Sequence, residues 1–475
     1  MLDVCIKIFD ELIKQEVNYC HWKSNEHLSD GLNGKTDMDL LVSKADAKKF
    51  SDILIKCECI NVQPQFGSRY TDVEEWVGYD RETGKLIHLH VHYRMITGAK
   101  HVKEYILPWH ALALDTKVLN GNIYVMEPNL ELIILYMRIV LKEQESIRKM
   151  DRFVVPSEYR KEILWLKKQI DRKILFNLIE KIWKKEKDNV LQLYCKEKLT
   201  KNDWAKLQEL ARVQADIVRR EKILNLYSIS ASRKRLVGVK RSLKKSFEIV
   251  PFTTLKTLRG KGYVFVFIGC DGSGKSSVTE EIHKWLSWKL DCQKFYFGTG
   301  VGYKKPIISR ISSMAWLPDI VRKICRMMFY YQVSWRCVYM RLLLDFYIRR
   351  GGIAVCDRYP QTQFKGIYDG PKIQALQLCN DSAWGRVFMR REEKNIAKVE
   401  NKKIDVLFKL MIPAEVALKR SPGHMLREVK RKAQITEKLQ FSECDVYEID
   451  ATQPFEEEIL EIKGIIWDKL VGKHS

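Results

Sequence analysis

A glycine-rich segment near the middle of the chain has the residue types and spacing of a phosphate-binding loop. Residues 269–276 read Gly-Cys-Asp-Gly-Ser-Gly-Lys-Ser and satisfy the pattern GxxxxGK[ST] in full. In such a loop the glycines let backbone N–H groups turn inward around phosphate oxygens. We expect Lys275 to contact the β- and γ-phosphates of ATP and the Ser276 hydroxyl to bind Mg²⁺.

The flanks of this loop agree with the motif. An apolar run, YVFVFI, precedes it, and a helix-like segment, SVTEEIHKWLSWKL, follows it. A strand before and a helix after are the context that the motif requires, so a chance glycine-rich turn is disfavoured. The predicted nucleotide-binding residues are Gly269, Asp271, Gly272, Ser273, Gly274, Lys275, Ser276 and Ser277.

A second set of residues could bind metal near the N-terminus. Asp37 and Asp39 begin a predicted strand at residues 37–42, where alternate side chains face the same side. Both carboxylates could therefore hold one divalent ion. His88, His90 and His92 alternate in the same way within a predicted strand at 86–93. The alternative interpretations are a pair of surface carboxylates and a half-exposed polar strand face.

Three regions would position these residues. Residues 1–128 mix strands and helices, and residues 129–260 are almost free of glycine and proline and have helical spacing. Residues 261–475 alternate buried strands with helices, which is typical of a doubly wound parallel sheet. The predicted fold class is α/β, with an α+β region before a helical, basic connecting region.

The composition indicates a folded protein that binds anions. The chain has 475 residues, a length that exceeds what one hydrophobic core usually accommodates, and 46% of the residues are hydrophobic. Lys and Arg number 83 and Asp and Glu 60, giving a net charge of +23 that favours anionic partners. Residues 232–246 mix basic and apolar side chains. An anionic membrane surface is one candidate partner for them, and a solvated linker is the alternative.

Other features bound the location and the partners. The twelve cysteines are scattered without a metal-binding or disulfide pattern. The first residues resemble an amphipathic helix and not a signal peptide, and no apolar run is long enough to span a membrane. We expect a cytoplasmic protein, with peripheral attachment at the inner face of the membrane as an option. No nucleic-acid-binding module is recognisable, so no specific nucleic-acid partner is predicted.

Four signatures in the last part of the chain occur together in a known order. They are VFIGCDGSGKSS, RRGGIAVCDRY, IDVLFKLMIPAEVALKR and VYEIDATQPFEEEILEI. In these signatures, residues 261–475 resemble thymidylate kinases of the P-loop nucleoside monophosphate kinase superfamily. The resemblance implies that Asp357 orients the acceptor or the Mg²⁺ shell, that Arg358 holds the acceptor phosphate and that Arg336 contacts the acceptor nucleotide. Arg420 and Arg427 are candidates to close over ATP, with a solvated helix face as the alternative.

The acceptor side departs from that family. YFGTGVGYKKP at 296–306 and PQTQFKGIYDGP at 360–371 replace its acceptor-binding segments. We therefore expect an ATP-dependent phosphotransferase acting on a nucleoside monophosphate or a related phosphorylated small molecule. The alternative is an ATP-gated binding or scaffold protein without turnover. The kinases it resembles are often dimers, so a homodimer is one expectation.

The segment NYCHWKSNEHLSDGLNGKTDMDLLV at 18–42 is similar to the nucleotidyltransferase superfamily. There, a turn precedes a strand with paired carboxylates, and Trp22-Lys23-Ser24 occupies the approximate place of that turn. A later strand supplies a third carboxylate, but His90 stands in that place here. The region could use another metal, bind nucleotides without catalysis, or take its acid from elsewhere, for which Glu74 and Glu75 are possibilities.

Overall fold

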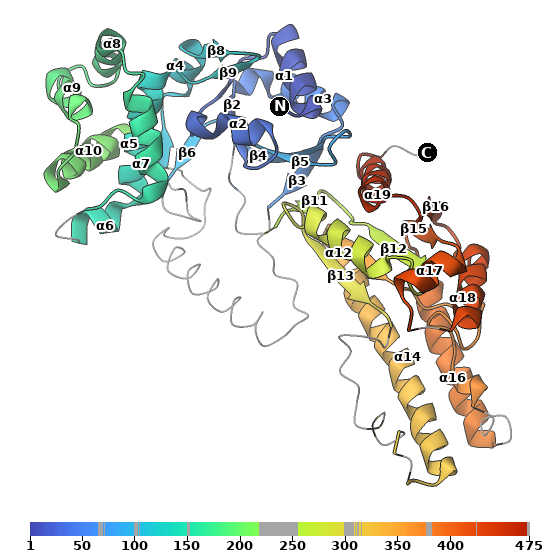
Figure 1. The fold of residues 1–475 in the computed structure, drawn as a ribbon. Helices are drawn as coiled ribbons and strands as arrows, with labels where there is room; N and C mark the ends of the chain where they lie inside the picture. Colours follow the sequence, from blue (N-terminus) through green and yellow to red (C-terminus); the bar gives the residue numbers. More distant parts are fainter. Residues whose placement is uncertain are drawn as a thin grey trace. The chain divides into compact units, whose positions relative to one another are not determined.

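The chain forms two compact units, Met1–Phe252 and Thr253–Ser475 (Figure 1). The computed structural model describes residues 1–64, 70, 72–98, 103, 105–149, 153–217, 255–298, 308, 310, 313–314, 316–376, 382–423 and 425–472. The basic segment 232–246, for which a membrane surface is one predicted partner, lies outside the described residues.

The first unit is built on a mixed sheet of short strands. In chain order they are β1 (Tyr19–His21), β2 (Met38–Val42), β3 (Ile60–Gln63), β4 (Val73–Tyr79), β5 (Leu86–His92), β8 (Val118–Asn120) and β9 (Ile123–Val125). Within this unit they lie in the order β3-β4-β5-β2-β1-β9-β8. The register places Asp39 of β2 and Glu75 of β4 on either side of His90 in β5. Three further strands, β6 (Met95–Thr97), β7 (Tyr105–Leu107) and β10 (Asp216–Ile217), pair separately in the order β10-β7-β6.

Helices α1 (Asp3–Lys14) and α3 (Ala47–Lys56) cover one face of this sheet. Ile8 and Leu12 of α1 and Phe50 and Leu54 of α3 recur at helical spacing and pack in one core with Leu89 of β5. Because alternate residues of a strand point to opposite faces, the histidines of β5 lie on the face away from these helices. The remaining short helices are α2 (Leu28–Leu32), α4 (His110–Asp115), η1 (Asn25–His27) and η2 (Lys44–Asp46).

A group of helices completes the first unit. They are α5 (Pro128–Lys142), α6 (Gln144–Lys149), α7 (Ser157–Lys167), α8 (Arg172–Ile182), α9 (Lys187–Cys195) and α10 (Lys201–Gln214). Helix α5 is buried along most of its length, and a helix that is apolar on every side must be surrounded. Helices α7, α8 and α10 contact it, and the same core contains Trp22 and Leu41 from the sheet. The region predicted to connect two domains therefore packs with the first unit as far as it is described.

The second unit contains a parallel five-stranded sheet, which confirms the predicted α/β class. Its strands are β12 (Val264–Gly269), β13 (Cys292–Tyr296), β14 (Ile353–Asp357), β15 (Val406–Met411) and β16 (Asp445–Asp450), in the order β13-β14-β12-β15-β16. Strand β12 is central, which explains why all of its residues are buried. The chain passes from β12 to one side of the sheet and then crosses to the other. In open α/β sheets, ligands bind outside the carboxyl ends of the strands at such a crossing.

Helices pack around this sheet. They are α12 (Lys275–Leu286), α14 (Asp319–Arg349), α16 (Ala383–Glu400), α17 (Ala414–Arg420), α18 (Leu426–Lys438), α19 (Phe455–Leu470) and the short η3 (Ile373–Ala375), and a two-residue strand, β11 (Thr257–Leu258), precedes them. Helix α14 lies alongside α16 (Figure 1), and its Leu344 and Tyr347 pack with Val264 and Val266 of β12. None of the described helices is long and apolar enough to cross a membrane.

Candidate functional site

The glycine-rich loop connects the carboxyl end of β12 to the first turn of α12. Gly272 and Gly274 have φ angles of +85° and +86°, a region that favours glycine. A Cβ atom on Gly272 would lie 2.2 Å from the carbonyl oxygen of Ala417, so the loop passes close against α17. A Cβ atom on Gly274 would meet nothing within 4 Å, and that glycine is needed for its backbone angle alone.

Lys275, the first residue of α12, folds back over this loop. Its side chain is buried, and its Nζ donates a hydrogen bond of 2.7 Å to the carbonyl oxygen of Cys270. Burial, followed by the nearby positive charge of Arg358, lowers the pKa of the Lys275 ammonium to about 8. A phosphate or other anion bound in the loop would raise the pKa of Lys275 again and favour its charged ammonium form.

The end of β14 lies beside the loop because β14 pairs with β12. Ser276 Oγ donates a 3.5 Å hydrogen bond to Asp357 Oδ2. Asp357 Oδ1 and Ser273 Oγ are buried, and neither has a hydrogen-bond partner within the described ranges. Hard oxygen donors of this kind are the ligands that Mg²⁺ prefers, so Ser276 and Asp357 fit the expected ion.

Asp271 links the loop to two cations. Its carboxylate pairs with Arg358 at 3.7 Å and with Lys432 of α18. Burial raises the pKa of Asp271, but the hydrogen bond and charge of Lys432 outweigh it and the pKa is lowered. Lys432 is the functional candidate of the second unit that the sequence did not single out. Its only signal is membership of the basic run that contains Arg427.

The other three predicted arginines have different surroundings. Arg336 of α14 donates hydrogen bonds to the carbonyl oxygens of Tyr296 (2.6 Å) and Gly298 (2.9 Å), at the carboxyl end of β13. Arg420 donates to the carbonyl oxygen of Ala451, after β16, and thus binds backbone at another edge of the sheet. Arg427 is exposed on the first turn of α18. In this conformation Arg420 contacts the backbone, and its contact with ATP stays a prediction.

The segment after β14 forms an ordered loop on the acceptor side. The amide of the fully buried Gln361 bonds the backbone of Phe364 and Ile367 and so closes the loop on itself. Asp369 has a φ of 56°, and its buried Oδ2 has no hydrogen-bond partner in the described part of the chain. Burial alone would lower the pKa of Arg358. The negative charge of Asp369 and of other acidic neighbours outweighs burial, so the pKa of Arg358 is raised.

In the first unit, the face of the sheet opposite α1 and α3 carries a cluster of histidines and carboxylates. Asp39 Oδ1 lies 2.9 Å from His90 Nδ1 and 3.5 Å from His92 Nε2, and these two nitrogens are 3.3 Å apart. Lys23 Nζ lies 2.8 Å from the same Asp39 oxygen. His92 is fully buried and His90 is mostly buried, so a half-exposed polar strand face is excluded.

Asp37 does not join Asp39 in this cluster. It is 41% exposed and contacts Nδ1 of His88 at 2.9 Å, while His88 Nε2 lies 2.7 Å from Glu75. Glu75 also lies 3.5 Å from His90 Nε2. The sequence suggested Glu74 or Glu75 for the missing acid. The structure places Glu75 at the cluster, whereas Glu74 accepts a hydrogen bond from Trp76.

Burial affects the charges of this cluster. Burial lowers the pKa of His90, although the negative charge of Glu75 acts in the opposite direction. Burial and the neighbouring His90 hold the pKa of His92 well below its usual range. Burial also raises the pKa of Asp39, but Lys23 and the two histidines outweigh it and hold that pKa well below its usual range. Burial therefore favours the neutral imidazoles of His90 and His92, while Lys23 favours the ionised carboxylate of Asp39.

Hydrogen bonds to two helices of the first unit, α5 and α7, hold the turn at residues 22–25 in place. Both the backbone N–H and the side-chain amide of Asn25 donate to the buried carboxylate of Glu131, at 2.9 and 2.7 Å. Glu162 of α7 accepts from the backbone N–H of Ser24, whose φ is 58°. These contacts position Lys23 against Asp39.

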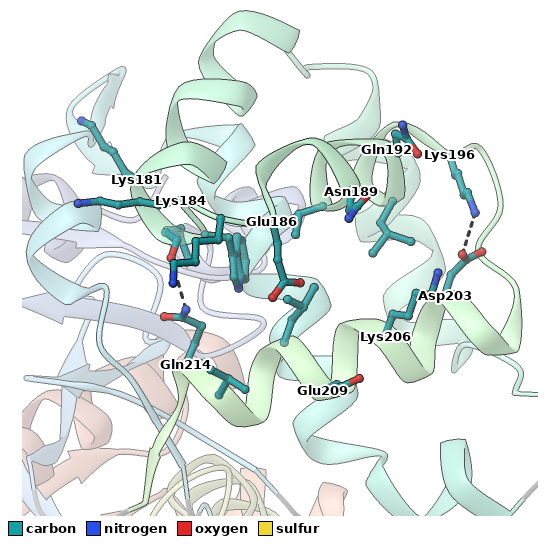
Figure 2. Close-up of a pocket in the computed structure, with 17 residues that line it drawn as sticks. Lys181, Lys184, Glu186, Asn189, Gln192, Lys196, Asp203, Lys206, Glu209 and Gln214 are labelled. Carbon is teal, nitrogen blue, oxygen red and sulfur yellow. Dashed lines mark hydrogen bonds and ion pairs between the residues drawn. The ribbon is translucent and has the colours of Figure 1, made fainter.

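A hollow of about 740 Å³ lies between α8, α9 and α10, away from the residues discussed so far. Figure 2 shows side chains of both charges around it, including Lys184, Lys206, Glu186 and the Lys196–Asp203 ion pair of 2.7 Å. None of the residues predicted from the sequence lines this hollow.

Part of the chain is similar to two known proteins. No protein-family model matches the chain. The uncharacterized ATP-binding protein YghS of Escherichia coli K12 is 26% identical over 211 residues, which are 41% of this chain and 88% of that protein. The uncharacterized ATP-binding protein YghR of the same strain is 27% identical over 212 residues, or 40% of this chain and 81% of that protein. The names of both similar proteins describe ATP binding.

Proposed function

We propose that the second unit binds ATP with Mg²⁺ at the glycine-rich loop and transfers the γ-phosphate to a small acceptor. The observation that carries the proposal is the meeting of Lys275, Ser276 and Asp357 at the carboxyl ends of two neighbouring central strands. The names of the similar proteins support ATP as the nucleotide. Phosphoryl transfer needs alignment and charge stabilisation more than covalent help from the protein, and these residues supply both.

In this proposal Lys275 exchanges its bond to the Cys270 carbonyl for the phosphates of ATP. Ser276 and Asp357 hold Mg²⁺, which neutralises charge on the phosphate oxygens. Lys432, held by Asp271, adds a positive charge beside the loop and takes the role expected of Arg420 or Arg427.

The acceptor belongs beside Arg358 in the same proposal. Arg358 follows β14 directly, pairs with the loop residue Asp271 at 3.7 Å and is affected by the negative charge of the acceptor-side residue Asp369. A guanidinium suits the phosphate of a nucleoside monophosphate or of a related phosphorylated small molecule. Because the segment at 360–371 differs from the acceptor-binding segment of thymidylate kinases, we assign only the phosphate of the acceptor.

An ATP-gated binding protein is the second candidate. The observation that favours it is the engagement of Arg336 and Arg420 with backbone carbonyls, which leaves fewer free cations for a transferred phosphate. A binding protein would hold ATP without releasing ADP faster when an acceptor is added.

The test is ADP formation from Mg-ATP by the full chain, across nucleoside monophosphates including thymidylate, sugar phosphates and polyols. We expect one acceptor class to stimulate turnover in the wild type and not in Lys275→Ala. ATP binding in calorimetry with no acceptor-stimulated ADP release across the panel would favour the gated-binding alternative. Absence of ATP binding would contradict both candidates.

A further inference from the structure

The histidine–carboxylate cluster of the first unit is not used by the proposed phosphotransferase. Asp39, His90 and His92 each offer one ligand atom, and all three atoms lie within 4.8 Å of one another. The two histidines are two residues apart on β5, and Asp39 of the neighbouring strand β2 lies opposite His90. The sheet itself therefore fixes this arrangement.

The spacing of the three atoms matches the ligands of one metal ion. Their separations are 2.9, 3.3 and 3.5 Å. Ligand atoms bound tetrahedrally at the usual zinc distances of about 2.0–2.1 Å lie about 3.3–3.4 Å apart, so little movement is needed to enclose an ion.

The donor set selects the kind of ion. Two imidazoles and one carboxylate suit divalent metals such as zinc or iron, whereas Mg²⁺ prefers oxygen donors. Glu75 faces Nε2 of His90, the ring nitrogen that Asp39 does not contact. A carboxylate in that position is the usual outer partner of a metal-binding histidine.

We propose that Asp39, His90 and His92 form a binding site for a divalent transition-metal ion. Asp37 is not one of the proposed ligands. Without metal, the Lys23 ammonium occupies the cationic position beside Asp39 Oδ1. Asp37 acts elsewhere, as the partner of His88. This inference concerns the first unit alone and does not depend on the phosphotransferase proposal.

The experiment is titration of the chelator-stripped full chain with Co²⁺, followed by its visible absorption bands, and with Zn²⁺ in equilibrium dialysis against excess Mg²⁺. No nucleotide is added, so the glycine-rich loop does not contribute. We expect one Co²⁺ or Zn²⁺ per chain that Mg²⁺ does not displace. Asp39→Asn should weaken binding by at least about tenfold, and the matched Asp37→Asn should change it by less than about threefold.

A third variant separates loss of the site from loss of folding. Lys23→Gln removes the competing ammonium and should tighten metal binding, an effect that misfolding cannot produce. The proposal is overturned if the wild type binds neither Co²⁺ nor Zn²⁺, if Asp37→Asn and Asp39→Asn weaken binding equally, or if Lys23→Gln weakens it.

Discussion

Asp271 is the residue that joins the glycine-rich loop to a distant helix. Its carboxylate would repel the phosphates of ATP if Lys432 and Arg358 did not neutralise it. We predict that Lys432→Met lowers the affinity for ATP by about tenfold, or about 1.4 kcal/mol. Titration calorimetry measures this, with Lys430→Met as the control, because Lys430 is an exposed lysine of the same helix that pairs with Glu415. Equal effects of the two variants would contradict the role of Lys432.

The protonation of Lys275 gives a second prediction at the scale of single residues. Its pKa of about 8 means that the nucleotide-free protein loses this charge as the pH rises through 8. Phosphate binding restores the charge, so ATP binding should take up a proton, and affinity should fall towards tenfold per pH unit above pH 8. Calorimetry in buffers of different ionisation heat measures the uptake. Affinity that stays constant between pH 7 and 9.5 would show that Lys275 keeps its proton.

At the scale of elements, the glycine-rich loop depends on its contact with α17. Gly272→Ala places a methyl group against the Ala417 carbonyl in addition to straining the backbone, whereas Gly274→Ala strains the backbone only. A positive φ costs an alanine about 1 kcal/mol. Gly272→Ala should therefore lower the melting temperature of the protein clearly more than Gly274→Ala in differential scanning calorimetry. Similar losses would mean that α17 moves away at little cost.

The sequence predicted best what is local along the chain. The glycine-rich loop, its flanking strand and helix, and Asp357 at the end of a buried strand follow from spacing within a few residues. Lys432 and Glu75 could not be assigned, because each comes from an element whose position depends on the whole fold. The bond of Arg420 to the backbone at Ala451 could not be predicted for the same reason, since it depends on where β16 ends. The α5 helix likewise packs with the sheet of the first unit, although its sequence alone suggested a separate region.

For the first unit as a whole, Glu131 of α5 connects the helices to the turn that follows β1, and it should make the stability of the protein depend on pH. Burial raises its pKa from 4.5 to about 7, although Asn25 donates to both oxygens. The folded state thus holds the proton more tightly than the unfolded state, and stability should fall as the pH rises from 4.5 to 7, by up to about 3 kcal/mol.

Chemical denaturation between pH 5 and 8 tests this dependence. Glu131→Gln should be less stable at low pH, because one hydrogen bond to Asn25 is lost, but its stability should change less with pH. Glu158→Gln, which alters an exposed carboxylate on α7, should keep the wild-type slope. A wild-type slope in Glu131→Gln would assign the pH dependence to other groups.

If the second unit transfers the γ-phosphate of ATP, as we propose, that phosphate must be found in the acceptor. ATP labelled in the γ-phosphate is incubated with Mg²⁺, the full chain and the acceptor panel, and the products are separated. We predict label in one small acceptor, lost in Lys275→Ala and in Asp357→Asn. Label that stays in ATP, or that appears only as inorganic phosphate whichever acceptor is present, would contradict the phosphotransferase.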